Sequence, residues 1–238
     1  MNLIRMLGVC MLASSAVCCH RTLAAPPASG LAAVAREQLC VTEGSITPAS
    51  AAYWWSVNTP KMRAYVNGSI SALVEARFIY LGPTGNEARL GSGELRRQLG
   101  LKLRAQDACN LVYAMWRIAP QSKLVVSVKR NPGQHTSAEC GNRGYRNIKP
   151  RHSVPVPALT VGAEHTLRGE LSGEQMRVLV DNALVWDGSV APDALDLDGP
   201  VGVRSDNARL NLELRAGLPL EGPPAQMPAC RTGSEEAE

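Results

Sequence analysis

Residues 165–214 constrain the fold of this chain most. Apolar residues occupy every second position of 167–171 and of 176–180, and the turn-forming pairs Ser172-Gly173 and Asp181-Asn182 follow these two runs. A period of two residues, interrupted by Gly, Asn and Asp, is typical of antiparallel hairpins and not of helices. The sequence therefore predicts an all-β protein built as an antiparallel β-sandwich.

The same segment resembles a known family. The stretches HTLRGELSGEQMRVLVDNALVWDG and GPVGVRSDNARLNLEL resemble the closing hairpins of laminin-G-like, concanavalin A-like jelly rolls in bacterial secreted proteins. Within that group they are most similar to the 3-keto-disaccharide hydrolase type of domain. The resemblance implies a jelly-roll fold and, as one alternative, an enzyme that acts on glycosides. No catalytic residue of that group can be carried over to this sequence.

The amino terminus predicts export. Arg5 provides a positive charge ahead of the apolar run 6–17, which is too short to span a bilayer, and cleavage after Ala24 fits a signal peptidase. A lipid anchor on Cys18 or Cys19 is the alternative. We expect a periplasmic protein, an outer-membrane lipoprotein or an extracellular protein. The expected segments are a signal peptide at 1–24, a linker at 25–45, the jelly-roll domain at 46–216 and a Pro-rich, acidic tail at 217–238.

Four cysteines follow the signal region: Cys40, Cys109, Cys140 and Cys230. An even number suits disulfides in an oxidising compartment, and three pairings are open. Cys40 with Cys230 would join the ends of the domain, and Cys109 with Cys140 would join neighbouring loops. No pair has the close Cys-x-x-Cys spacing of structural zinc, so we expect two disulfides and no zinc site.

Two hairpins within 96–130 can be set in register. If 106–109 closes the first, paired positions sum to 215 and the leucines at 99, 101 and 103 face the core. Pairs in the second hairpin then sum to 242, which continues the core side and places Lys129 opposite Tyr113. The opposite side becomes a basic face with one aromatic ring, and its expected ligand-binding residues are Lys102, Arg104, Tyr113, Arg117 and Lys129.

Charge is unevenly distributed along the chain. Residues 89–151 hold thirteen Lys or Arg and three Asp or Glu, a net +10, whereas residues 152–238 hold six and fourteen, a net −8. A local positive field suits an anionic glycan, and Tyr113 could stack on a sugar ring. The alternative is that acidic strands interleave with the basic ones in a jelly roll and neutralise them.

We therefore expect an exported, non-catalytic domain that binds carbohydrate or an anionic envelope polymer. A glycoside-acting enzyme and a protein-adhesion module are the alternatives, and the oligomeric state stays open. Nucleic acid is not expected as a partner, because no nucleic-acid-binding motif is present. Trp54 and Trp55 could form a sugar platform, although at least one should lie in the core.

Catalytic and metal-binding candidates are weaker. His165 begins a strand and is better explained as a structural residue than as an acid or base. No strand carries the alternating carboxylates of laminarinase-type glucanases, so no catalytic residue is assigned. Asp193, Asp196 and Asp198 could donate oxygens to calcium, but an acidic turn is the commoner explanation. We expect no cofactor, with calcium as the exception to test.

Overall fold

A computed structural model describes residues 30–69 and 72–217, and two antiparallel sheets account for most of them. One sheet has nine strands: β1 (Leu31–Ala33), β3 (Thr47–Pro48), β4 (Trp55–Val57), β6 (Leu73–Pro83), β11 (His152–Ser153), β12 (Glu164–Ser172), β13 (Gln175–Val180), β14 (Ala183–Ser189) and β16 (Ala208–Gly217). The other has seven: β2 (Leu39–Glu43), β5 (Lys61–Val66), β7 (Arg97–Leu103), β8 (Leu111–Ala119), β9 (Lys123–Lys129), β10 (Tyr145–Asn147) and β15 (Gly202–Asp206).

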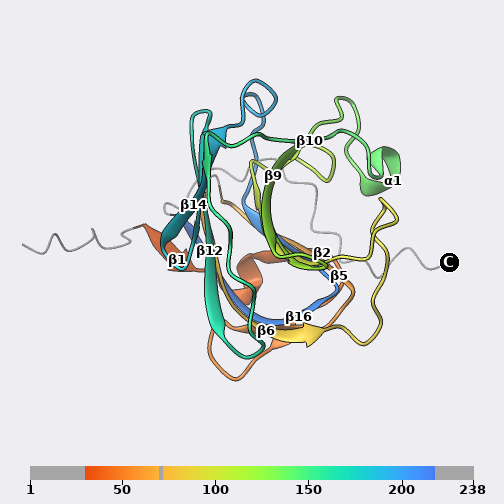
Figure 1. The fold of residues 1–238 in the computed structure, drawn as a ribbon. Helices are drawn as coiled ribbons and strands as arrows, with labels where there is room; N and C mark the ends of the chain where they lie inside the picture. Colours follow the sequence, from red (N-terminus) through yellow and green to blue (C-terminus); the bar gives the residue numbers. More distant parts are fainter. Residues whose placement is uncertain (1–29, 70–71, 218–238) are drawn as a thin grey trace, which may run out of the picture.

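The strand order is that of a sandwich with crossovers between its layers (Figure 1). The nine-stranded sheet runs β11-β14-β13-β12-β6-β16-β4-β3, and β1 also pairs with β16. The seven-stranded sheet runs β10-β9-β8-β7-β15-β5-β2. The predicted all-β jelly roll is confirmed.

Helices are short and lie outside the sheets. They are the 3-10 turn η1 (Arg36–Gln38) and the single turn α1 (Ser137–Cys140), which Thr136 caps by accepting a hydrogen bond from the Glu139 amide. In the part of the chain that the structure describes, no helix has the length and apolar character needed to cross a membrane.

Apolar side chains from both sheets meet between the layers. Strand alternation turns Leu99, Leu101 and Leu103 of β7 inward, as expected. Phe78 of the nine-stranded sheet packs edge-on against Trp116 of the seven-stranded sheet, with ring centroids 5.6 Å apart. Because one face of each sheet is buried in this core, the opposite face of the seven-stranded sheet, called the outer face below, is left for other contacts.

Local turn chemistry sets the hairpins of the second half. Asp181 and Asn182 both have positive φ (50° and 64°), the pair of angles that a two-residue type I′ turn requires between β13 and β14. Between β7 and β8 the predicted register is confirmed, with Leu99 opposite Trp116 and Leu101 opposite Ala114.

The predicted register between β8 and β9 is wrong by two residues. Ser127, and not Lys129, lies opposite Tyr113, so that paired positions sum to 240 and Lys129 lies opposite Leu111. The actual turn is centred one residue earlier than expected. A shift of two residues leaves each side chain on its predicted face, because side chains alternate with a period of two.

The linker expected at 25–45 is also corrected. Residues 31–33 form β1, which pairs with β16, and residues 39–43 form β2, which pairs with β5. These segments of three and five residues are too short for their alternation to be recognised in the sequence. The signal peptide, both candidate lipidation sites and the tail after residue 217 lie outside the described residues.

Candidate functional site

Cross-strand pairing gathers polar and aromatic side chains in rows on the outer face. Neighbouring strands form three rows across β5, β15, β7, β8 and β9. The first row is Tyr65, Gly202, Lys102, Tyr113 and Ser127; the second is Arg63, Arg204, Gly100, Met115 and Val125; the third is Lys61, Asp206, Gln98, Arg117 and Lys123.

Part of this face forms a hollow of about 220 Å³. Its floor is the outer face between β15 and β9, and its walls are the loop between β6 and β7 and the segment that enters β10. The floor residues are Gln98, Tyr113, Met115, Arg117, Val125, Ser127 and Arg204. The wall residues are Leu90, Gly91, Ser92, Glu94 and Arg96 on one side and Asn142, Tyr145 and Asn147 on the other.

Arg117 is a cation of the hollow whose Nε lacks a hydrogen bond in the described residues. Its Nε is buried and has no hydrogen-bond partner within the described chain. Partial burial lowers the pKa of the Arg117 guanidinium, the positive charge of Arg96 lowers it further, and the negative charge of Glu94 acts in the opposite direction. An arginine nevertheless keeps its proton in proteins. Its neighbour Arg96 is already paired with Glu94 on the wall.

Tyr145 presents a fixed aromatic ring at the rim of the hollow. The residue is 38% exposed. Its ring stacks on that of Tyr113 with centroids 6.0 Å apart, and its hydroxyl accepts a hydrogen bond of 3.1 Å from Arg204 Nη1. The Nζ of Lys129 lies 5.2 Å from the same ring centroid. Tyr113 itself is only 4% exposed and lies beneath Tyr145, so Tyr145 presents the accessible ring and Tyr113 supports it.

A buried carboxylate holds Arg204 in place behind these rings. Asp206 accepts hydrogen bonds from Arg204 Nε at 2.9 Å, Arg63 Nη2 at 2.7 Å and Gln98 Nε2 at 2.7 Å. Burial alone would raise the pKa of Asp206, but the two arginines outweigh it and lower that pKa below its ordinary value. The carboxylate thus stays charged and orients the guanidinium that holds Tyr145.

Lys102 lies on the predicted face but is not available to a ligand. Only 2% of the residue is exposed, and its Nζ lies 3.7 Å from the centroid of the Tyr65 ring. Burial lowers the pKa of Lys102 well below its usual range, and the charges of Arg63 and Arg204 act in the same direction. Lys102 therefore packs the sheet face and does not line the hollow.

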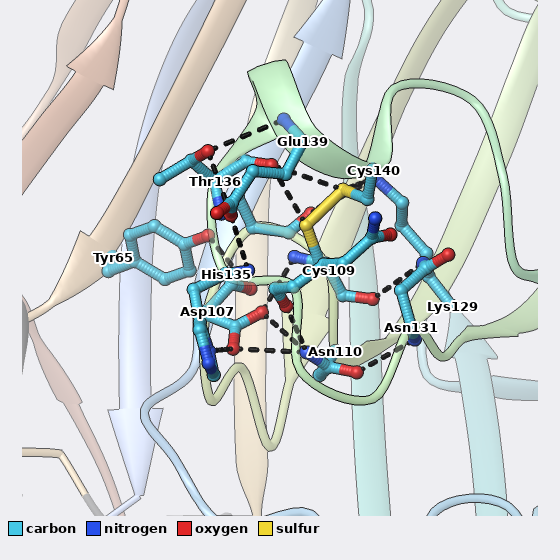
Figure 2. A network of polar contacts seen from close by, with 12 residues as sticks. Tyr65, Asp107, Cys109, Asn110, Lys129, Asn131, His135, Thr136, Glu139 and Cys140 are labelled. Atoms are coloured by element: carbon cyan, nitrogen blue, oxygen red, sulfur yellow. Dashed lines mark hydrogen bonds and ion pairs between the residues drawn. A yellow bond between two sulfur atoms is a disulfide. The ribbon is translucent and has the colours of Figure 1, made fainter.

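Lys129 also lies on this face, as a structural connector beside the disulfide (Figure 2). Its Nζ donates hydrogen bonds to the carbonyls of Ala108 at 3.1 Å and Gly141 at 2.9 Å, and to Cys140 Sγ at 3.0 Å. Burial, followed by the positive charge of Arg204, lowers the pKa of Lys129 to about 8. The side chain connects two loops and does not line the hollow.

The expectation that Arg104 shares the basic face is wrong. The strand β7 ends at Leu103, and Arg104 has a φ of 46°, so the alternation of side chains stops before it. Its guanidinium donates to the carbonyls of Ala194 and Gly173, at 2.8 Å each. Arg104 therefore joins loops at another edge of the sheet.

A disulfide fixes the loops beside the hollow. Cys109 and Cys140 are bonded, which confirms one of the predicted disulfides and one of the pairings left open. Figure 2 shows the surrounding network, in which Asp107 accepts from Asn110 at 2.9 Å and meets His135 Nδ1 at 2.8 Å. Cys40 is buried in β2, and Cys230 lies outside the described residues.

The remaining candidates lie away from the hollow. His165 Nδ1 lies 2.8 Å from an Asp181 carboxylate oxygen, and its ring packs against Trp116 with centroids 5.7 Å apart. Trp55 packs against the core, whereas Trp54 lies beneath the Arg77 guanidinium on the nine-stranded sheet.

The acidic segment at 193–198 is held by arginines. Asp193 forms an ion pair with Arg146, and Asp196 forms one with Arg130. Within the described ranges, no group of three or more His, Cys, Asp or Glu side chains is arranged to hold a metal ion.

Comparison with known proteins leaves the family open and identifies the fold. No family model matches the chain, and no curated protein matches it. The carbohydrate-binding module CBM66 from Bacillus subtilis is 14% identical, over 74% of this chain and 91% of that chain, with a TM-score of 0.50. The Crh5 transglycosylase (12% identity, 83% and 87% covered, TM-score 0.48) and the galectin LEC-6 of Caenorhabditis elegans (10% identity, 78% and 99% covered, TM-score 0.41) also align. The resemblance to the 3-keto-disaccharide hydrolase type is not confirmed, and the chain has the concanavalin A-like jelly-roll fold.

Proposed function

We propose that this protein is a non-catalytic module that binds carbohydrate in the hollow, and that the bound sugar carries an acidic group. The observation that carries the proposal is the Arg117 guanidinium, whose Nε lacks a hydrogen bond within the described ranges, in the same hollow as the exposed ring of Tyr145 that stacks on Tyr113. Aromatic rings stack on the apolar face of a sugar, and a guanidinium binds a carboxylate through two parallel hydrogen bonds. The similarity in fold to a carbohydrate-binding module supports the same class of ligand.

Charge explains why the ligand should be acidic. Arg117 is partly buried and its Nε lacks a hydrogen bond in the part of the chain that is described, and Glu94, the carboxylate that acts on its charge, is already paired with Arg96. Partial loss of water by such a cation is costly when no opposite charge of its own compensates for it. A ligand carboxylate would supply that charge, whereas a neutral sugar would leave most of the cost in place. Arg117 is thus the residue expected to distinguish an acidic sugar from a neutral one.

The carboxylate that lines the hollow favours binding over hydrolysis. Glu94 is the carboxylate among its lining residues, and it is paired with Arg96. Hydrogen bonds from Arg96 and Ser92 lower the pKa of Glu94, which keeps it ionised and unsuited to act as an acid. Most glycosidases use two carboxyl groups on either side of the scissile bond.

Export remains part of the proposal. The Cys109–Cys140 disulfide supports it, because such bonds persist in oxidising compartments and are rare in the cytosol. Amino-terminal sequencing and mass measurement of the protein purified from its membrane and soluble fractions would show whether the chain begins after Ala24 or at an acylated Cys18 or Cys19.

The test is a glycan-array screen of the domain at low and moderate salt, followed by calorimetric titration of an acidic hit. Arg117→Lys keeps the charge but loses the two-point contact, so we expect about tenfold weaker binding. Arg117→Leu should lose detectable binding. Arg177→Lys, on an exposed site of the nine-stranded sheet, is the control and should bind like the unaltered protein. Equal binding of neutral and acidic glycans, unaffected by Arg117→Leu, would contradict the proposal.

A further inference from the structure

Two loops meet above the hollow. Gly91 lies in the loop between β6 and β7, and Asn142 lies between α1 and β10. A Cβ placed on Gly91 would be 3.3 Å from the Asn142 Cβ and 3.9 Å from its Cγ, so the two loops approach each other closely there. Figure 1 shows the yellow segment before β7 rising along the open side of the seven-stranded sheet to the neighbourhood of α1. The close approach of Gly91 and Asn142 is called the roof below.

The loop that carries Gly91 is tied down at both ends by one residue. The buried side chain of Asn207 donates to the carbonyls of Ala88 at 2.8 Å and Arg96 at 2.9 Å, and accepts from the Ala88 amide at 2.8 Å. Arg97 Nε adds a contact of 2.6 Å to Glu87. The loop therefore has a defined path over the sheet.

The segment that carries Asn142 is anchored equally well. Its neighbour Gly141 accepts a hydrogen bond of 2.9 Å from Lys129 Nζ, and Cys140 is bonded to Cys109. The amide of Arg143 donates to the Cys140 carbonyl at 3.0 Å. Both sides of the roof are thus held by contacts that do not depend on a ligand.

The volume of the hollow and the roof above it together limit which part of a glycan can enter. The hollow of about 220 Å³ is smaller than the roughly 300–1,000 Å³ typical of sites for drug-sized ligands, so it holds one ring-sized group. A polysaccharide laid flat across the outer face would have to pass between Gly91 and Asn142, where the two loops approach each other closely. The end of a chain can enter beside the roof without displacing it.

We propose that the roof makes the hollow selective for the terminal residue of a glycan, so that the ligand is an acidic sugar at a chain end. This inference rests on the proposed function and adds to it the part of the chain that is recognised. Arg117 on the floor takes the acidic group, Tyr145 at the rim contacts the ring, and the roof excludes continuation of the chain across the face.

The test compares arrayed glycans that carry the same uronic acid at the terminus or inside the chain. Titration of uronic-acid oligosaccharides of two, four and eight residues then gives the stoichiometry. We expect terminal hits only, no more than one protein per chain end, and an affinity per chain that varies less than about threefold with length. Binding to internal residues, or several proteins on the longest chain, would overturn the inference.

Two variants separate the roof from the floor. Asn142→Gly removes the Cβ and Cγ that lie closest to Gly91 of the opposite loop, and should admit internal residues, with stoichiometry rising with length. Asn142→Ala keeps the Cβ that approaches Gly91 and is the matched control, expected to remain terminal-specific. Unchanged end-specificity in Asn142→Gly would refute the roof as its cause. Binding that requires Arg117 but no chain end would overturn this inference alone, whereas absence of any glycan binding would overturn the proposed function with it.

Discussion

Lys102, Arg117 and Lys129 share one sheet face but differ in what balances their charge. Lys102 lies over an aromatic ring, and Lys129 donates to two carbonyls and a sulfur atom. The buried Nε of Arg117 has no such partner in the described structure. Residue type and strand alternation can predict which face a cation occupies, but whether it is already satisfied depends on loops that the alternation does not describe.

Lys129 predicts a pH dependence of stability. Its pKa is lowered to about 8 from the ordinary 10.5. Below about pH 8 the amine is charged in both states, and the full cost of burying it is present. Between pH 8 and 10.5 the unfolded chain still holds a proton that the folded chain has released, so the free energy of unfolding rises with pH. Lys102, whose pKa is also lowered, contributes with the same sign.

Urea denaturation between pH 7 and pH 10 measures this rise. Lys129→Met should reduce the slope, and Lys123→Met, at the exposed start of β9, should leave it unchanged. Measurement stops at pH 10, because burial raises the pKa of Tyr113 to about 12 and so destabilises the folded state once unfolded tyrosines ionise. Identical slopes in the two variants would contradict this assignment.

At the scale of strands, the sequence predicts pairing between strands that are close together in the chain better than pairing between strands that are far apart in it. The β7–β8 register and the β13–β14 turn follow from residues close together in the chain, and both are confirmed. The strand β15 lies between β5 and β7 in the sheet, although both are about a hundred residues or more away in the sequence. No local sequence pattern predicts that pairing. Arg204, Asp206 and Tyr65 were therefore missed as members of the outer face.

Gly100 determines the shape of the floor. A Cβ at this position would lie 2.2 Å from Met115 Sδ and 2.6 Å from the Ala114 carbonyl oxygen. The glycine thus allows the methionine side chain to lie across β7. Gly100→Ala should push Met115 into the hollow, weaken glycan binding and lower the free energy of unfolding by about 1–3 kcal/mol. Gly85→Ala, with nothing within 4 Å of its Cβ, is the control in both assays; an unaltered affinity in Gly100→Ala would count against the floor as the binding surface.

The disulfide should stabilise the loops that carry the roof. Cys109 and Cys140 are separated by 31 residues, and closing a loop of that length restricts the unfolded chain by roughly 3–4 kcal/mol. We expect the double variant Cys109→Ser/Cys140→Ser to lose about that free energy of unfolding in a urea titration. Because Asn142 follows this disulfide, the same variant should also bind internal glycan residues more readily. A loss below about 1 kcal/mol would show that the polar network alone holds the loops.

At the scale of the whole molecule, the charges of the basic segment 89–151 and the acidic segment 152–238 neutralise one another in part. Three arginines of the basic segment, at positions 130, 146 and 151, pair with Asp196, Asp193 and Asp187 of the acidic segment. The alternative that acidic strands neutralise the basic ones thus accounts for part of the positive charge of the basic segment, because the jelly-roll crossovers bring the two segments together. We expect ligand binding to depend on Arg117 and not on the net charge of the chain.

A crystal structure of the complete domain with an acidic oligosaccharide from the array would test the central claim most directly. We expect one sugar ring in the hollow against Tyr145, with its carboxylate within hydrogen-bonding distance of the Arg117 guanidinium and the rest of the chain leaving beside the roof formed by Gly91 and Asn142. A sugar bound on the nine-stranded sheet, or a ring in the hollow whose acidic group points away from Arg117, would contradict the account.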